Sequence, residues 1–170
     1  TLWGWGANYL GRRGDNTQGT RRSSPVQIPG TTWSAISGSY DPILAFKTDG
    51  TLWSWGGNSD GQLGQNDRIA RSSPVQIPGT TWSIDTEKFA MGTEAAGAIK
   101  TNGTLWSWGY NDFGALGQNN RTKYSSPTQI PGTTWATITS GSYATFGVKT
   151  DGTLWAWGKN NLGQLGQNDG

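Results

Sequence analysis

Apolar and small residues alternate in a short segment that recurs along the chain. Residues 1–6, 51–56, 104–109 and 153–158 all read Thr-Leu-Trp-small-Trp-Gly. Successive side chains of a β-strand point to opposite faces, so this alternation puts both indoles on one face and the leucine with the small residue on the other. The segment predicts a strand that is apolar on both faces, with large side chains on one and smaller ones on the other.

Other segments of the first repeat alternate in the same way, around residues 26–28, 33–36 and 44–46. Each repeat therefore offers about four short strands, and we expect no helix of any length. Hairpin signals Thr-Asp-Gly or Thr-Asn-Gly stand at 48–50, 101–103 and 150–152. Asp, Asn and Gly tolerate the positive φ that tight hairpins need, so each of these triplets predicts a turn between two strands.

The strands belong to a repeat of about 50 residues. Its other landmarks are an Asn-x-x-Gly-x-x-Gly element and the sequence SSPVQIPGTTW or SSPTQIPGTTW. The predicted boundaries are 1–50, 51–103 and 104–152, with a partial fourth repeat at 153–170. Four strands in each repeat, apolar on both faces, favour an all-β propeller of four-stranded blades, with about three and a third repeats present. A parallel β-helix is the alternative, although its coils are usually shorter.

Tryptophan supplies the apolar surface that aliphatic residues do not. The chain has 11 Trp and 27 Gly but only 32% hydrophobic and 14% charged residues. A buried indole removes roughly 150–250 Å² from water, so we expect every Trp to belong to the structural core. They are Trp3, Trp5, Trp33, Trp53, Trp55, Trp82, Trp106, Trp108, Trp135, Trp155 and Trp157.

Cysteine and histidine are both absent. Their absence excludes thiol nucleophiles, serine–histidine catalysis and the usual zinc sites. We therefore predict a protein that is not an enzyme and that uses no cofactor or metal. No apolar run approaches the roughly 20 residues of a membrane-spanning helix, so no membrane span is expected.

Positive charge collects in the loops between the Asn element and the SSP element. These loops hold 8 of the 13 Lys and Arg residues, and the whole chain has a net charge of +2. Equivalent loops lie at equivalent places in a propeller, so they predict a candidate face for an anionic partner. Its residues are Arg12, Arg13, Arg21, Arg22, Arg68, Arg71, Arg121 and Lys123.

An acidic protein, an anionic glycan or an anionic lipid would suit this face. Nucleic acid is an unlikely partner because the net charge is small and the Trp residues are assigned to the core. Solvated loops whose arginines only maintain solubility are the simpler interpretation.

The repeated asparagines Asn8, Asn58, Asn111 and Asn160 have two interpretations. Beside Asp60 and Asp112 they could bind sugar or calcium. An Asn three residues before a Gly can also stabilise a turn by bonding its own backbone, and recurrence in every repeat favours that structural role.

Residues 53–64 (WSWGGNSDGQLG) and 155–166 (WAWGKNNLGQLG) resemble the signature of the regulator of chromosome condensation repeat family. The resemblance extends over the chain and implies a propeller of about seven blades. A His that the family often has before one strand is replaced here by Pro42, Ala95 and Ala144. Nucleotide exchange on a small GTPase belongs to particular members and depends on residues outside the signature, so it is not transferred.

Two other departures are candidate specialisations. The first repeat has GRRG (11–14) where others have GQLG, and the second has about four extra residues between Trp82 and Lys100. Residues 1 and 153 occupy the same phase of the repeat, so the last piece duplicates the first and does not complete it. We expect either a longer chain or association of copies to cover the two ends.

The pattern favours a non-enzymatic structural or interaction module. The near-identity of the repeats resembles bacterial or phage proteins, which favours a virion or extracellular surface role and location. The alternatives are a regulatory protein-binding propeller, of exchange-factor or inhibitor type, and a glycan-binding module. Further copies or blades of the same propeller are also candidate partners.

Overall fold

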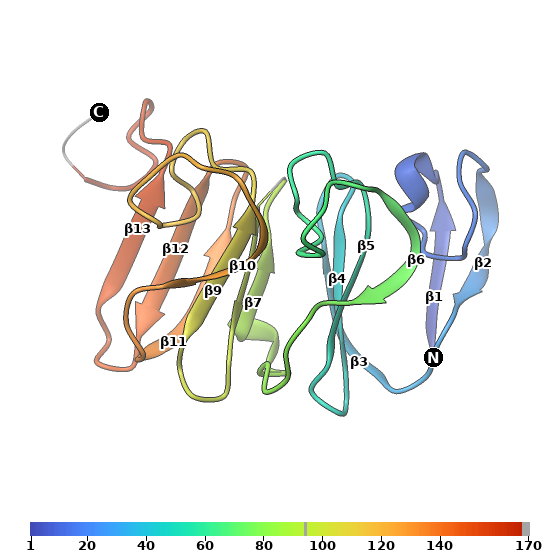
Figure 1. Cartoon of the computed structure of the whole chain (residues 1–170), viewed down its shortest axis with the longest axis horizontal. Helices are drawn as coiled ribbons and strands as arrows, with labels where there is room; N and C mark the ends of the chain where they lie inside the picture. Colours follow the sequence, from blue (N-terminus) through green and yellow to red (C-terminus); the bar gives the residue numbers. More distant parts are fainter. Residues whose placement is uncertain (94, 168–170) are drawn as a thin grey trace.

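The structure is a computed structural model that describes residues 1–93 and 95–167. The end of the predicted fourth repeat, 168–170, lies outside the described residues, as does residue 94. The described residues form antiparallel sheets that stand side by side in chain order (Figure 1). Besides strands there are two three-residue 3-10 turns, η1 (Tyr9–Gly11) and η2 (Thr86–Lys88). The prediction of an all-β propeller arc is confirmed.

Two of the sheets are complete four-stranded blades. The first is ordered β3-β4-β5-β6 and the second β10-β9-β8-β7. Their strands are β3 (Trp33–Gly38), β4 (Ile43–Lys47), β5 (Leu52–Gly56), β6 (Arg71–Gln76), β7 (Phe89–Met91), β8 (Ala95–Ile99), β9 (Leu105–Gly109) and β10 (Tyr124–Ile130). Each complete blade takes its first two strands from one repeat and its last two from the next. Blades and sequence repeats are therefore out of phase.

The sheets at the two ends contain fewer strands. One pairs β1 (Leu2–Gly6) with β2 (Arg22–Ile28). The other is ordered β11-β12-β13, with β11 (Trp135–Ser140), β12 (Ala144–Lys149) and β13 (Leu154–Gly158). Thus the first sheet holds only the third and fourth strands of a blade, and the last sheet lacks the fourth strand.

Large and small faces meet between blades as the alternation predicts. Leu44, Phe46 and Leu52 of the first blade share a buried cluster with Trp82 and Trp108 of the second. The next junction repeats this arrangement, because Leu105 and Ile99 share a cluster with Trp135, Ile138 and Trp157. Burial of this apolar surface, at about 25 cal/mol per Å², holds successive blades together.

The prediction that every Trp lies in the core is wrong for three of them. Trp3, Trp5 and Trp155 are 48%, 64% and 49% exposed. They lie in the two end sheets, which have no neighbouring blade on one side. Four of the others, Trp55, Trp82, Trp108 and Trp135, are buried, and the remaining four are partly buried: Trp33, Trp53, Trp106 and Trp157.

The insertion of the second repeat lies on the first strand of its blade. Trp82 bridges Lys100, the chain then forms η2, and β7 resumes pairing at Phe89. Asp85 accepts a hydrogen bond from the amide of Glu87 at 3.3 Å and so caps η2. The inserted residues thus bulge from one strand and leave the blade intact. Within the described residues no helix is long and apolar enough to cross a membrane.

Candidate functional site

The loops that join the third and fourth strands of successive blades lie on one face of the arc, which we call the loop face (top in Figure 1). Each loop is built around its first Asn. The Asn58 Oδ1 atom accepts a hydrogen bond from the Leu63 amide at 2.9 Å, and its Nδ2 donates to the carbonyls of Asp67 and Ile69 at 3.1 Å. Asn8, Asn111 and Asn160 accept the same amide bond in their loops, at 2.9–3.0 Å.

These bonds confirm the structural interpretation of the repeated asparagines. Asn8, Asn58 and Asn111 are buried, and their amide groups bond the backbone instead of facing a ligand. Among the described residues there is also no group of three or more His, Cys, Asp or Glu side chains that could hold a metal ion.

A tryptophan of the following blade bonds each of the first three loops. The indole Nε1 of Trp55 donates to the Arg12 carbonyl at 3.0 Å, Trp108 to that of Gln62 at 2.9 Å, and Trp157 to that of Ala115 at 2.8 Å. The three acceptors occupy the same position of the repeat. The second indole of the signature therefore joins neighbouring repeats, and the loop face is held rigid.

Arg13 is not available to a partner, so its assignment to the anionic-partner face is wrong. It occupies the place of Leu63 and its side chain is fully buried. Its guanidinium pairs with Asp15 at 2.7 Å and donates to the Thr20 carbonyl at 2.8 Å. Burial raises the pKa of Asp15, but hydrogen bonds from Thr17 and Arg13 together with the Arg13 charge outweigh it and hold the pKa below its usual value.

Three other predicted cations pair with carboxylates of the same face. Arg12 lies 3.6 Å from Asp41 and Arg71 lies 2.6 Å from Asp67. Lys123 bridges two loops, with Asp60 at 2.8 Å and Asp112 at 3.5 Å. The hydrogen bond from Lys123 to Asp60 raises the pKa of the lysine. The remaining predicted residues, Arg21, Arg22, Arg68 and Arg121, are exposed, and their binding of an anionic partner stays a prediction.

Aromatic side chains gather beside these cations at the first junction. Tyr9, Leu10 and Tyr40 are 54%, 49% and 72% exposed. The Arg12 guanidinium lies over the rings of Tyr9 and Tyr40, at 5.4 and 5.9 Å, and donates to the Tyr40 carbonyl at 2.7 Å. Arg21 donates to the Tyr9 hydroxyl at 3.1 Å, and this bond and the charge of Arg21 lower the pKa of Tyr9. We call these five residues the first aromatic cluster.

A second aromatic cluster lies at the junction between β9 and β12. Its rings are Tyr110, Phe113 and Tyr143, and the centroids of Phe113 and Tyr143 are 5.0 Å apart. Lys159 lies 4.8 Å from the Phe113 ring and 5.3 Å from the Tyr143 ring, while Lys123 lies 4.5 Å from Tyr110. Burial and a hydrogen bond with Asp112 raise the pKa of Tyr110.

Sequence reasoning missed both clusters because each is assembled from distant segments. Tyr40 and Tyr143 each end a Gly-Ser-Tyr triplet, at 38–40 and 141–143, and this repetition was the one sequence signal that pointed to the clusters.

The opposite face carries a different recurrent arrangement, with Lys47, Lys100 and Lys149 each over two indoles. Those lysines cover Trp rings of their own blades and are part of its packing.

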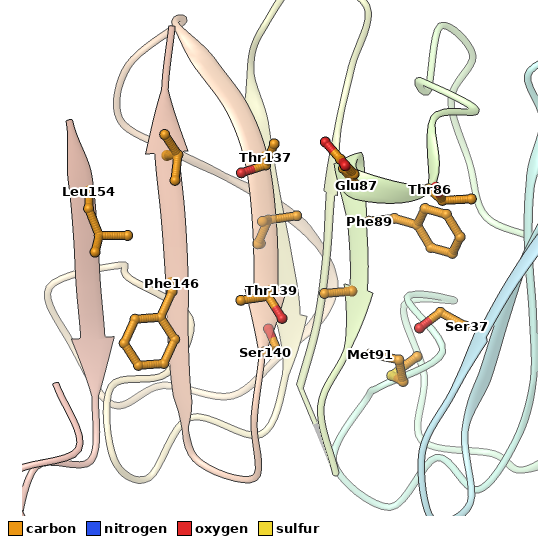
Figure 2. Close-up of a pocket in the computed structure, with 13 residues that line it drawn as sticks. Ser37, Thr86, Glu87, Phe89, Met91, Thr137, Thr139, Ser140, Phe146 and Leu154 are labelled. Carbon is orange, nitrogen blue, oxygen red and sulfur yellow. The ribbon is translucent and has the colours of Figure 1, made fainter. Parts of the chain in front are cut away.

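A groove of about 570 Å³ runs along the first strands of the blades (Figure 2). Hydroxyl groups of Thr137, Thr139 and Ser140 line it from β11, and Glu87 of η2 stands beside Thr137. Leu154, which is 69% exposed, closes one side of the groove and belongs to an end sheet. The groove is therefore continuous with the uncovered face of the last sheet.

Comparison with known proteins agrees with this architecture. The human WBSCR16 crystal structure has a TM-score of 0.82 at 24% identity and covers 96% of this chain, which is 44% of that chain. The Arabidopsis thaliana ultraviolet-B receptor UVR8 is 26% identical over 75% of this chain and 29% of its own length. The X-linked retinitis pigmentosa GTPase regulator homolog of Caenorhabditis elegans is 31% identical over 63% of this chain and 8% of its own length.

The chain thus spans less than a third of the curated relatives that it matches. The family described as the regulator of chromosome condensation (RCC1) repeat matches residues 49–94 and 102–148, and a second form of the same repeat matches 135–164. Together these matches extend over more than half of the sequence. They include Asn58, Asn111 and Asn160 together with Trp55, Trp108 and Trp157, the indoles that bond the loops, and the chain belongs to the regulator of chromosome condensation repeat family.

Proposed function

We propose that this propeller segment binds a protein partner through its loop face and acts as a non-catalytic, regulatory module. The observation that carries the proposal is the gathering of aromatic side chains into two clusters on that face, in which Tyr9, Tyr40 and Phe113 are exposed. Tyr and Arg are enriched among the residues that contribute most of the binding energy at protein interfaces. The first aromatic cluster combines Tyr9, Leu10 and Tyr40 with Arg12 and Arg21.

Rigidity of the loop face supports the same function. Arg12 is held by two backbone carbonyls, those of Ala7 at 3.3 Å and Tyr40 at 2.7 Å. The carbonyl of Arg12 in turn accepts the Trp55 indole. A surface that is ordered before it binds loses less conformational entropy in the complex, which raises affinity.

A receptor and a GTPase regulator are named among the relatives, and both names favour the regulatory interpretation over a virion or surface role. A virion or extracellular location stays a prediction from the near-identity of the repeats. Glycan binding through the repeated asparagines is not favoured, since their amides already bond the backbone. A protein partner is also consistent with the projecting clusters, because small-molecule sites are concave and bury most of the ligand.

Site-specific photocrosslinking in the full-length protein tests this proposal. A photoreactive phenylalanine at Tyr40 or Tyr143 is expected to crosslink a discrete partner in cells of the source organism. The matched control is the same residue at Thr31, an exposed position between β2 and β3 on the opposite face. Equal crosslinking from Thr31 and Tyr40, or no crosslink from Tyr40 and Tyr143, would contradict the proposal.

A further inference from the structure

Every carboxylate of the loop face in residues 1–93 and 95–167 is paired with a cation of the same face. Its acidic residues in the described chain are Asp15, Asp41, Asp60, Asp67 and Asp112, and each lies within 3.6 Å of a Lys or Arg nitrogen. The cations that pair with them are Arg12, Arg13, Arg71 and Lys123. The other cations of the face are therefore not offset by any carboxylate that the structure describes.

Five cations of the loop face have no carboxylate partner among the residues that the structure describes. We call them the unpaired cations: Arg21, Arg22, Arg68, Arg121 and Lys159. Among the residues that the structure describes, the face holds nine basic and five acidic side chains, an excess of four positive charges, in a chain whose net charge is +2. Charge of one sign gathered on one surface attracts a partner of the opposite sign and speeds its association.

The unpaired cations follow the repeat. Arg68 and Arg121 stand at the same position of successive loops, because each follows the residue whose carbonyl accepts the loop Asn, Asp67 or Asn120. Arg21 and Lys159 belong to the first and second aromatic clusters. Cations thus recur from blade to blade along the face, with aromatic clusters at two of the junctions.

From these features we propose that the loop face binds an acidic, extended segment of a protein partner, laid across successive loops. Its carboxylates contact Arg21, Arg68, Arg121 and Lys159, and its apolar or aromatic side chains contact Tyr40 and Tyr143. This inference rests on the proposed function and names the chemistry of the partner.

Nucleic acid fits the same face less well. A phosphate backbone carries charge at every nucleotide, whereas the unpaired cations recur only from loop to loop. Base stacking needs open ring faces, whereas Phe113 and Tyr143 contact each other and Lys159. A peptide with spaced carboxylates avoids both conflicts.

Fluorescence anisotropy of the full-length protein tests the proposal with three labelled probes: a peptide of alternating Glu and Tyr, a peptide of alternating Lys and Tyr, and a duplex DNA. The acidic peptide is expected to bind most tightly, and more weakly as salt is raised. Replacing Arg21, Arg68, Arg121 or Lys159 singly by Ser is expected to weaken it about fivefold, the effect of about 1 kcal/mol per exposed charge pair.

The matched control is Lys88→Ser, which removes one positive charge from η2 outside the loop face and is expected to leave the affinity unchanged. Thermal unfolding of every variant verifies that the substitutions keep the fold. Equal weakening by Lys88→Ser, or tighter binding of the DNA or of the basic peptide, would overturn the inference. If crosslinking from Tyr40 succeeds but the acidic peptide does not bind, the proposed function stands and the acidic chemistry is wrong.

Discussion

The loops of the first and second repeats have the same backbone hydrogen bonds, but the side chain buried inside the loop is charged in one and apolar in the other. In both, an Asn accepts the amide five residues later at 2.9 Å, of Arg13 in one and Leu63 in the other. In both, the next blade donates a Trp Nε1 to the carbonyl that precedes this residue, at 3.0 and 2.9 Å. The interior side chain is a cation in the first loop and aliphatic in the second.

Neighbouring residues differ together with the interior side chain. Leu63 accompanies Ser54, whose hydroxyl donates to the Leu63 carbonyl at 2.7 Å, and Gln65, which donates to the Ser54 hydroxyl. Arg13 accompanies Gly4, where a β-carbon would come within 3.0 Å of the arginine Cγ, and Asp15. The comparison teaches that Asn and Trp determine the loop backbone. The interior can be ionic or apolar, provided that its neighbours match.

The largest effect is expected from removing what the two loops share. Asn8→Ala and Asn58→Ala should each lower the free energy of unfolding by about 4 kcal/mol, because each leaves buried backbone groups without partners. The two losses should agree within about 1 kcal/mol in chemical denaturation. Asn102→Ala, at an exposed turn, is the control and should cost less than about 1 kcal/mol. Unequal losses at Asn8 and Asn58 would show that the stability of the loop backbone depends on the side chain buried inside the loop.

A smaller effect should separate the two loops. Arg13→Met leaves the Asp15 carboxylate, whose side chain is 5% exposed, without its cation, and should cost about 3 kcal/mol. Leu63→Met preserves the volume of an apolar side chain and should cost about 1 kcal/mol. Adding Asp15→Asn to Arg13→Met should recover part of the loss, since the unpaired charge is removed. Equal costs for the two methionine variants would argue against an ionic interior in the first loop.

The smallest effect at neutral pH is expected from exchanging the whole interior. Gly4→Ser, Arg13→Leu and Asp15→Gln together should change the unfolding free energy by no more than about 1 kcal/mol, because they copy Ser54, Leu63 and Gln65, and a matched set with an apolar side chain at its centre can replace a buried ion pair.

Acid should then reveal the difference between this triple variant and the unchanged protein. The folded-state pKa of Asp15 is lowered, so its contribution is complete above the unfolded value of about 3.9 and is lost as pH falls through the folded value. Denaturation series between pH 7 and pH 2 should show the unchanged protein losing more stability than the triple variant below about pH 4. Parallel curves would contradict this assignment.

Regular features of the repeat were predictable from the sequence, and departures from it were not. Trp-small-Trp alternation predicted the strand and the meeting of large and small faces. Arg13 was assigned to the surface because Arg is seldom buried without a partner, and its partners Asp15 and Thr20 are visible only in the folded loop. The aromatic clusters escaped prediction because Tyr40 and Arg12 meet across a blade junction that no sequence window contains.

The offset between blades and sequence repeats has an evolutionary consequence. Loss or duplication of a 50-residue unit in the gene joins the first two strands of one blade to the last two strands of another. Because β4 pairs with β5, and β8 with β9, in the same antiparallel sense across the repeat boundary, the new half-blades can pair as the old ones did. Near-identical repeats also recombine readily. Such a propeller can therefore change its number of blades by unequal exchange without an intermediate that carries a broken sheet.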